Sequence, residues 1–280
     1  MRIKQLKQFG FNTDHRTYVI AEIGINHGGD LGLAERLIES AARTGVDAVK
    51  FQTYITEKRA PKGNQEIFDI LKRCELPFEA FRTLKECAVS HGVNFFSTPF
   101  DRESVEYLDS IGVDLYKVAS FDVVNFELLR ELAKTGKPVI MSVGMADRSE
   151  IDLAFKTLSS GTRNIALLHC VSSYPLKEEN ANLAAIYDLQ DLYGCVIGYS
   201  DHTPGIEVPL MAVAAGAQVI EKHFRIDDEM DCVDAPVSIS EAQTKELIIQ
   251  IRRVEATFGQ GGLVMHDAEK STAVFRRPTI

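Results

Sequence analysis

The sequence has no long hydrophobic run, no closely spaced cysteine pair and no excess of basic residues. Its longest apolar stretches, such as Val208–Ala217, fall well short of the roughly 20 residues that span a bilayer. The N-terminal residues 1–12 lack the apolar stretch and cleavage site of a secretory signal, so we expect a cytoplasmic protein that does not bind membranes. A net charge of −9 argues against nucleic acid as a partner.

Cysteine is also sparse. The five cysteines form an odd set with no metal-ligand spacing, which favours neither a disulfide framework nor a zinc site, and we expect reduced, structural thiols. Hydrophobic residues make up 45% of the chain and charged residues 25%, which is typical of a soluble globular protein. A chain of 280 residues fits either two domains of ordinary size or one α/β barrel of about 250 residues.

Short, β-rich apolar runs recur eight times along the chain, and each is short enough for one strand. The runs are Tyr18–Gly24, Ala48–Gln52, Val93–Thr98, Leu115–Ala119, Val139–Val143, Ile165–Cys170, Val196–Ser200 and Val219–Phe224. Longer segments between them carry apolar residues at helical spacing, as in Leu31–Thr44 and Phe126–Thr135. Strand and helix therefore alternate throughout.

Eight such units with buried strands require a parallel sheet covered by helices, and eight strands can close into a barrel. We predict an α/β fold with one domain, a (β/α)8 TIM barrel over residues 18–258, and an open doubly wound sheet as the alternative. Residues 1–17 are expected to cap the bottom of the barrel, and residues 259–280 to form a polar tail.

Polar residues gather at the C-terminal ends of the predicted strands, where barrel enzymes place their sites. Lys50 and Lys117 are the least expected, because an unpaired ammonium group is costly in a buried strand. Together with hydroxyl donors at neighbouring strand ends, they fit a phosphate or carboxylate ligand. These donors are Thr98, Ser120, Ser142 and Ser200. The alternative is that each lysine reaches solvent or pairs with a nearby Asp or Glu.

Two histidines end the seventh and eighth predicted strands, which are neighbours in a closed barrel. The imidazoles of His202 and His223 could therefore converge on one divalent metal. With two nitrogen ligands, the other positions would hold water and substrate oxygens, which suits an exchangeable Mn²⁺, or Mg²⁺ or Co²⁺, better than structural zinc. The alternative is a pair of structural histidines. His91 and His266 lie away from the strand ends and are expected on the surface.

Three acidic residues near strand ends could act as general acids or bases: Glu22, Asp122 and Asp234. The alternatives are that Asp122 and Asp234 cap loops or helices, and that Glu22 pairs with Lys50. The run His27–Asp30 could cradle an anion, but it is also typical of a turn before a helix, and we interpret it as a loop.

These strand ends resemble the N-acetylneuraminate (sialic acid) synthase family of phosphoenolpyruvate-dependent nonulosonic acid synthases. The resemblance covers roughly residues 18–258. The matching motifs, in order, are Ala21–His27, Val49–Thr53, Ser97–Phe100, Tyr116–Ser120, Leu168–Cys170, Gly198–Thr203 and Glu221–Phe224. The family's barrel condenses phosphoenolpyruvate with an N-acylated hexose, so the resemblance implies an enzyme, a C–C bond-forming transferase of sialic acid biosynthesis.

The resemblance implies a role for each matched position. The phosphoenolpyruvate-binding set is Lys50, Thr98, Lys117, Ser120, Ser142 and Ser200. His202 and His223 become the metal ligands, and Glu22 the catalytic acid/base or the carboxylate that stabilises an intermediate. Lys50 and Lys117 stabilise charge during catalysis.

Contacts to the acceptor sugar are implied for Gln52, Tyr174 and Asp234, whereas Asp122 and Ser172 depart from the family pattern. They stand where the family has a glutamate and an asparagine that bind the sugar. A carboxylate shortened by one methylene moves by about 1.5 Å, enough to disturb a hydrogen bond. The acceptor therefore stays open between N-acetylmannosamine and a 2,4-diacetamido-trideoxyhexose.

Members of this family usually continue into a small antifreeze-like (SAF) domain that gives an arginine to the partner subunit's site. Residues 269–280 resemble the linker into that domain, and we interpret the sequence as a short form. Three explanations of the short form stay open: a natural short protein, a truncated sequence, or a protein whose antifreeze-like domain is supplied by another polypeptide. The resemblance also implies a homodimer.

In the implied reaction, C3 of phosphoenolpyruvate attacks the sugar aldehyde, water adds at C2 and phosphate leaves by C–O cleavage. One alternative is a synthase of another sugar acid, such as the eight-carbon 3-deoxy-octulosonate type. It is disfavoured because Phe51–Thr53, rather than an Asn-Arg-Ser motif, follows Lys50. The other is a non-catalytic barrel that binds phosphoenolpyruvate or sugar, against which the presence of Glu22, His202 and His223 argues.

Overall fold

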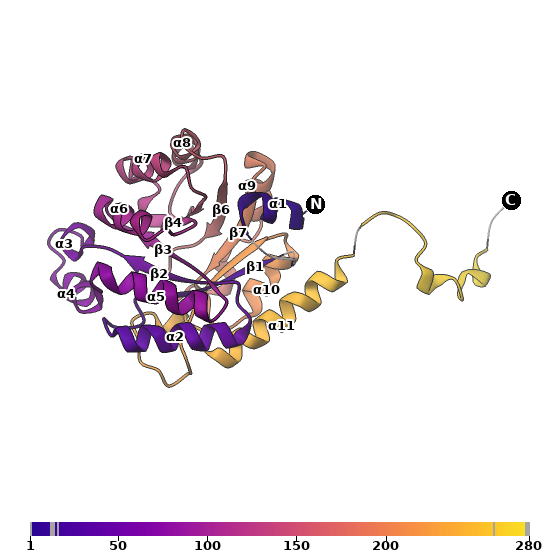
Figure 1. Cartoon of the computed structure of the whole chain (residues 1–280). Helices are drawn as coiled ribbons and strands as arrows, with labels where there is room; N and C mark the ends of the chain where they lie inside the picture. The colour runs from indigo at the N-terminus through magenta and orange to yellow at the C-terminus, as the bar shows by residue number, and fades with distance from the viewer. Residues whose placement is uncertain (1, 12–14, 16, 260, 278–280) are drawn as a thin grey trace.

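The computed structural model describes residues 2–11, 15, 17–259 and 261–277, and eight parallel strands form a closed barrel at its centre (Figure 1). The strands pair in chain order, and β1 also pairs with β8. They are β1 (Tyr18–Gly24), β2 (Ala48–Thr53), β3 (Asn94–Pro99), β4 (Tyr116–Val118), β5 (Val139–Ser142), β6 (Ile165–Cys170), β7 (Val196–Asp201) and β8 (Val219–His223). Closure confirms the predicted (β/α)8 barrel and excludes the open sheet.

Helices surround this barrel (Figure 1). They are α1 (Arg2–Phe9), α2 (Leu31–Thr44), α3 (Thr56–Arg59), α4 (Gln65–Cys74), α5 (Phe78–Ser90), α6 (Arg102–Ser110), α7 (Phe126–Thr135), α8 (Arg148–Ser159), α9 (Ala185–Tyr193), α10 (Glu207–Ala214) and α11 (Glu241–Thr257). The predicted strand bounds hold to within one residue at each end. The regular alternation does not hold between β2 and β3, where α3, α4 and α5 stand in place of one helix.

The helix bounds follow from their caps. The side chain of Asp30 accepts a hydrogen bond from the Leu33 backbone N–H at 2.9 Å, which begins α2, and Gly45 ends it in the left-handed region with φ 89°. Helix α7 is bounded in the same way by Asn125 and by Gly136, whose φ is 70°. Both helices therefore begin and end where the sequence predicts.

Side chains along each strand alternate between the barrel interior and the helix layer. The interior side chains form one buried apolar cluster, whose members on the strands or directly before them are Tyr18, Ile20, Ala48, Phe96, Leu115, Ile140, Ala166, Leu168, Val196 and Val219. The residues two or four positions further along each strand face the same interior, nearer its C-terminal end. Strand period alone thus directs Glu22, Lys50 and Lys117 inward, above this apolar layer.

Helix α1 lies at the opposite, N-terminal end of the barrel. Leu6, Phe9 and Phe11 are buried in the same interior cluster, and the Phe11 ring stacks on Tyr18 with a centroid distance of 3.8 Å. Parts of the predicted cap and tail, residues 1, 12–14, 16, 260 and 278–280, lie outside the described residues. Residues 261–277 are exposed apart from Ala273, and Figure 1 shows them beyond the end of α11, away from the barrel.

Other sequence predictions can be compared directly with the structure. All five cysteines are free thiols, as predicted. His91 and His266 are exposed, also as predicted. Among the described residues, no helix combines the length and the apolar character needed to cross a membrane.

Candidate active site

Most of the predicted site residues meet at the C-terminal end of the barrel, around a cavity of about 60 Å³. The predicted residues that line it are Glu22, Lys50, Gln52, Thr98, Lys117, Ser120, Ser142, Tyr174, Ser200, His202 and His223. They come from seven of the eight strands and from the loops after β4, β6 and β7, so closure of the barrel is what brings them together. Three predicted residues do not line the cavity: Asp122, Ser172 and Asp234.

Both lysines form buried ion pairs. Lys50 Nζ lies 2.8 Å from Glu22 Oε2 and 3.8 Å from Glu221 Oε2, and Lys117 Nζ lies 3.3 Å from Glu221 Oε1. None of the four side chains is more than 6% exposed. Two ammonium groups thus face two carboxylates, and the alternative that the lysines pair with carboxylates of the chain itself is the arrangement observed. The lysines alone no longer require an anionic ligand.

Hydroxyl groups next to the lysines accept hydrogen bonds from the chain itself. Thr98 Oγ1 accepts a hydrogen bond from Lys50 Nζ at 3.1 Å, and Ser142 Oγ accepts one from Lys117 Nζ at 2.7 Å. Ser120 Oγ accepts one from the Gly144 backbone N–H at 3.0 Å. A hydroxyl that accepts through a lone pair keeps its O–H free to donate.

Three O–H donors, from Thr98, Ser120 and Ser142, are therefore available to a ligand oxygen in this cavity. Ser200 differs, because its hydroxyl donates to Glu221 Oε1 at 2.9 Å. The donor set suits a ligand rich in acceptor oxygens.

The surroundings shift the pKa values of Glu22 and Glu221 in opposite directions. Burial raises the pKa of Glu22, helped by the charge of Glu221, and the nearby Lys50 only partly opposes it. Burial also acts to raise the pKa of Glu221, but the charges of Lys117 and Lys50 together hold it below its usual range. Of the two carboxyl groups, Glu22 is therefore the one whose surroundings favour the protonated form.

The two histidines at the ends of β7 and β8 lie side by side, with ring centroids 5.5 Å apart. His202 Nδ1 lies 3.1 Å from the Val171 carbonyl oxygen, and His223 Nδ1 lies 3.2 Å from Asp234 Oδ2. Burial, followed by the charge of His223, lowers the pKa of His202 to about 3, so this ring is neutral. Burial lowers the pKa of His223 as well, but the Asp234 carboxylate outweighs it and raises the value.

These contacts fit a metal site. A carbonyl or carboxylate on one ring nitrogen fixes the ring and leaves the other nitrogen for the ion, which is the usual environment of a histidine ligand. In the described part of the chain, no three or more His, Cys, Asp or Glu side chains are grouped so as to hold a metal ion. A cation on His202 and His223 would therefore complete its coordination with water or substrate oxygens.

Tyr174 and Gln52 lie at the outer side of this group. The Tyr174 ring packs on His202 with a centroid distance of 4.0 Å and meets the His223 ring edge-on at 6.0 Å. Gln52 Nε2 donates to Glu22 Oε1 at 3.1 Å. Tyr174 is 46% exposed and so stands between the imidazoles and solvent. A sugar entering the cavity would meet this ring.

The three predicted sugar contacts outside the cavity have partners of their own. Asp122 Oδ1 accepts from the Asn125 side chain at 2.9 Å, next to the start of α7. Asp234 faces His223 and is held in place because the Asn26 side chain accepts its backbone N–H at 2.9 Å. Ser172 Oγ lies 3.9 Å from Cys170 Sγ. In this structure Asp234 orients a histidine and Asp122 supports a helix start.

Sequence reasoning missed two charged residues of the cavity, Glu221 and Arg59. Glu221 had a detectable signal, since it lies two positions before His223 on the same strand and shares its face. Arg59 had none, because it ends α3, a helix that a regular alternation of strand and helix does not contain.

The run His27–Asp30 serves as a turn and a helix start. The His27 Nδ1 atom accepts the Gly29 backbone N–H at 3.1 Å, so the imidazole folds back on its own turn. A Cβ atom on Gly29 would lie 2.2 Å from the Arg73 carbonyl oxygen, so only glycine fits there. This agrees with the interpretation of the run as a loop.

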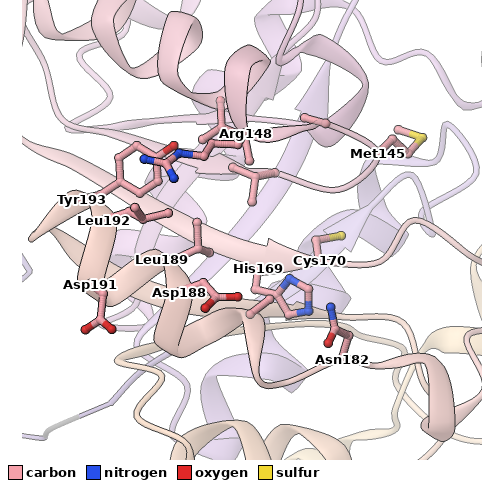
Figure 2. A pocket seen from close by; sticks show the side chains of 14 residues that line it. Met145, Arg148, His169, Cys170, Asn182, Asp188, Leu189, Asp191, Leu192 and Tyr193 are labelled. Atoms are coloured by element: carbon pink, nitrogen blue, oxygen red, sulfur yellow. The ribbon is translucent and has the colours of Figure 1, made fainter.

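A second cavity of about 630 Å³ opens between α8 and α9, and Cys170 lines both cavities. Figure 2 shows Arg148 and Tyr193 at one end of it and His169, Cys170 and Asn182 at the other. His169 Nε2 bonds to the Ala181 carbonyl oxygen at 2.8 Å, which ties its ring to the wall. No residue predicted for the site lines this larger cavity.

Comparison with known proteins points to one family of synthases. The NeuB family profile matches residues 37–262. The chain is 39% identical to N,N'-diacetyllegionaminic acid synthase of Campylobacter jejuni over 88% of this chain and 78% of that protein. It is 32% identical to pseudaminic acid synthase of the same species, over 95% and 82%.

Among solved structures, N-acetylneuraminic acid (sialic acid) synthetase from Leptospira borgpetersenii, in complex with citrate, superposes with a TM-score of 0.90. It is 41% identical, and the match covers 93% of this chain and 91% of that one.

Proposed function

Because this chain belongs to the NeuB family of synthases, we propose that it condenses phosphoenolpyruvate with an N-acylated hexose. The product would be a nine-carbon nonulosonic acid. The observation that carries the proposal is the buried set of two lysines and three free hydroxyl donors at the cavity floor, next to a pair of oriented imidazoles.

In this proposal, C3 of phosphoenolpyruvate bonds to the aldehyde carbon of the sugar, and water adds to C2. The C2–O bond then breaks, and inorganic phosphate leaves. Lys50 and Lys117 offset the charge of the phosphate and carboxylate groups, and the hydroxyls of Thr98, Ser120 and Ser142 donate to their oxygens. Ser200 contributes indirectly, because its hydroxyl donates to Glu221 and helps to keep that carboxylate ionised.

Glu22 is suited to exchange a proton with the water that adds at C2, because its surroundings favour the protonated form more than those of Glu221 do. His202 and His223 would hold Mn²⁺, with Mg²⁺ or Co²⁺ as alternatives, and the bound cation supplies Lewis-acid polarisation of the aldehyde. Gln52 and Tyr174 would contact the sugar at the open side of the cavity.

The relatives support two classes of acceptor. The synthases of diacetyllegionaminic and pseudaminic acid favour a 2,4-diacetamido-trideoxyhexose, and the sialic acid synthetase favours N-acetylmannosamine. The sialic acid synthetase is 41% identical and the legionaminic acid synthase 39%, so identity does not separate the two classes, but the first class includes both the legionaminic and the pseudaminic acid synthases. We propose a 2,4-diacetamido-trideoxyhexose as the acceptor and keep N-acetylmannosamine as the alternative.

The test is release of inorganic phosphate from phosphoenolpyruvate in the presence of Mn²⁺, with and without each sugar, followed by mass spectrometry of the product. Phosphate that depends on the sugar, with a product mass equal to sugar plus pyruvate, supports the proposal and names the acceptor. Phosphoenolpyruvate binding without turnover of any sugar would instead favour the non-catalytic barrel.

A further inference from the structure

Arg59 has no role in the reaction described above, although it lines the same cavity. It ends α3 (Thr56–Arg59), and its guanidinium group lies over two aromatic rings. The guanidinium carbon is 4.4 Å from the centroid of the Tyr54 ring and 3.9 Å from that of Phe100. Contact with two rings fixes the plane and position of the group.

The guanidinium group is also incompletely satisfied. Its Nη1 atom is buried, and within the part of the chain that the structure describes it has no hydrogen-bond partner. No carboxylate oxygen of the described residues lies within ion-pair distance of it. A buried polar group without a partner is costly, and native proteins keep few of them outside functional sites.

The charges around Arg59 indicate which partner it lacks. Burial lowers the pKa of Arg59. Tyr54 and then the charges of Asp234, Asp122 and Glu22 act in the opposite direction. Burial outweighs these charges, but they make this side of the cavity electronegative. A ligand anion on this side of the cavity would be repelled by these carboxylates, of which Glu22 lines the cavity. The carbonyl oxygen of an uncharged group would accept from the guanidinium group without that repulsion.

We propose that Arg59 is a specificity-determining residue that donates hydrogen bonds to the carbonyl oxygen of an acylamido group on the acceptor sugar. The inference rests on the proposed function, which it deepens by assigning the group that selects N-acylated sugars. Rejection of a sugar without the acyl group follows, because that sugar leaves Nη1 buried and unpaired.

The experiment compares the wild-type enzyme with Arg59→Met, which keeps the length of the side chain, and Arg59→Lys, which keeps the charge but not the planar fork. The acceptors are N-acetylmannosamine and a 2,4-diacetamido-trideoxyhexose, each beside an analogue with hydroxyl in place of acetamido. Arg59→Met is expected to raise KM for the acylated sugar by about 10- to 100-fold, with kcat and the KM for phosphoenolpyruvate within about twofold. The preference for acylated over hydroxyl sugar should fall by the same factor, and Arg59→Lys should recover part of it.

Arg82→Met, an exposed position on α5, is the matched control and should leave both KM values unchanged. An equal loss on acylated and hydroxyl sugars would show a structural role for Arg59, and a raised KM for phosphoenolpyruvate would place it with the phosphate. Either result overturns the inference.

If the wild-type enzyme turns over no sugar, the proposed function fails separately. The role of Arg59 in sugar binding is then tested by measuring equilibrium binding of the same sugars to the wild type and to Arg59→Met. A 10-fold or greater loss for the acylated sugars supports its role, and equal affinities overturn it.

Discussion

Lys50 Nζ lies 2.8 Å from Glu22 Oε2, in a place where neither side chain is more than 4% exposed. Loss of one partner from such a pair leaves a buried charge and costs about 3–5 kcal/mol, whereas loss of both costs much less. We therefore expect Glu22→Gln to lower the free energy of unfolding by about 3 kcal/mol.

The double variant Glu22→Gln/Lys50→Met should lose less than the sum of the two single variants. Urea unfolding of all four proteins measures this coupling. Strictly additive losses would mean that the two side chains do not interact in solution.

Lys117→Ala should weaken phosphoenolpyruvate binding by at least about 100-fold, because it removes the charge and leaves Ser142 without its donor at 2.7 Å. Isothermal titration calorimetry measures the affinity. Lys134→Ala, at an exposed lysine on α7, is the control and should bind like the wild type. Affinity retained in Lys117→Ala would remove this lysine from the binding set.

Mn²⁺ binding should depend on both histidines and on the carboxylate behind one of them. His202→Ala and His223→Ala are expected to abolish binding, and Asp234→Asn to weaken it by about 10- to 100-fold, because Asp234 orients the His223 ring. Electron paramagnetic resonance of free Mn²⁺ gives the affinities, and His91→Ala at the exposed His91 is the control. Unchanged binding in both histidine variants would place the cation elsewhere.

The stability of the fold should fall between pH 7 and pH 5.5 because of His27. Burial lowers the pKa of His27 to about 4, below its usual value of 6.5. The unfolded chain therefore takes up a proton first as the pH drops, and stability that is fully present above about pH 6.5 is lost progressively down to about pH 4. Over the first part of this range the loss is about 1 kcal/mol.

His27→Gln should remove this part of the pH dependence, and His91→Gln should leave it in place. Urea unfolding at both pH values is the measurement. An unchanged slope in His27→Gln would show that other groups carry it.

Gly198→Ala should destabilise the barrel by about 1–3 kcal/mol. A Cβ atom there would lie 2.4 Å from the Val219 carbonyl oxygen and 2.5 Å from Leu168 Cδ2, inside the closed sheet. Gly32→Ala is the matched control, since its Cβ atom meets only ordinary contacts on α2 and favours helix. Thermal unfolding should show a lower Tm for the first variant and an equal or higher one for the second.

Much of the barrel could be predicted from the sequence, because strand period and strand-end position are local properties. Inward positions such as Lys50, Lys117 and Ser142 follow from counting by two along each strand. The same rule directs Asp201 and Lys222 outward, where they form a buried ion pair at 2.6 Å under the helices.

The partners of these residues could not be predicted. Whether Lys117 faces a ligand or Glu221 depends on how far the strands are staggered around the barrel, and no local pattern encodes that stagger. Arg59 illustrates a second limit, because its position over Tyr54 and Phe100 depends on the path of an inserted segment. Asp234 illustrates a third, since its position rests on Asn26, 208 residues away.

The pairing of β1 with β8 ties assembly of the charged cluster to the end of synthesis. Glu22 leaves the ribosome with the first strand, but Glu221 and His223 follow about 200 residues later, which corresponds to roughly 10–40 s of elongation. Until then, Lys117 has no carboxylate partner and the sheet has two open edges. The nascent chain therefore carries its future active site as an incomplete, unbalanced set of charges until β8 has been made.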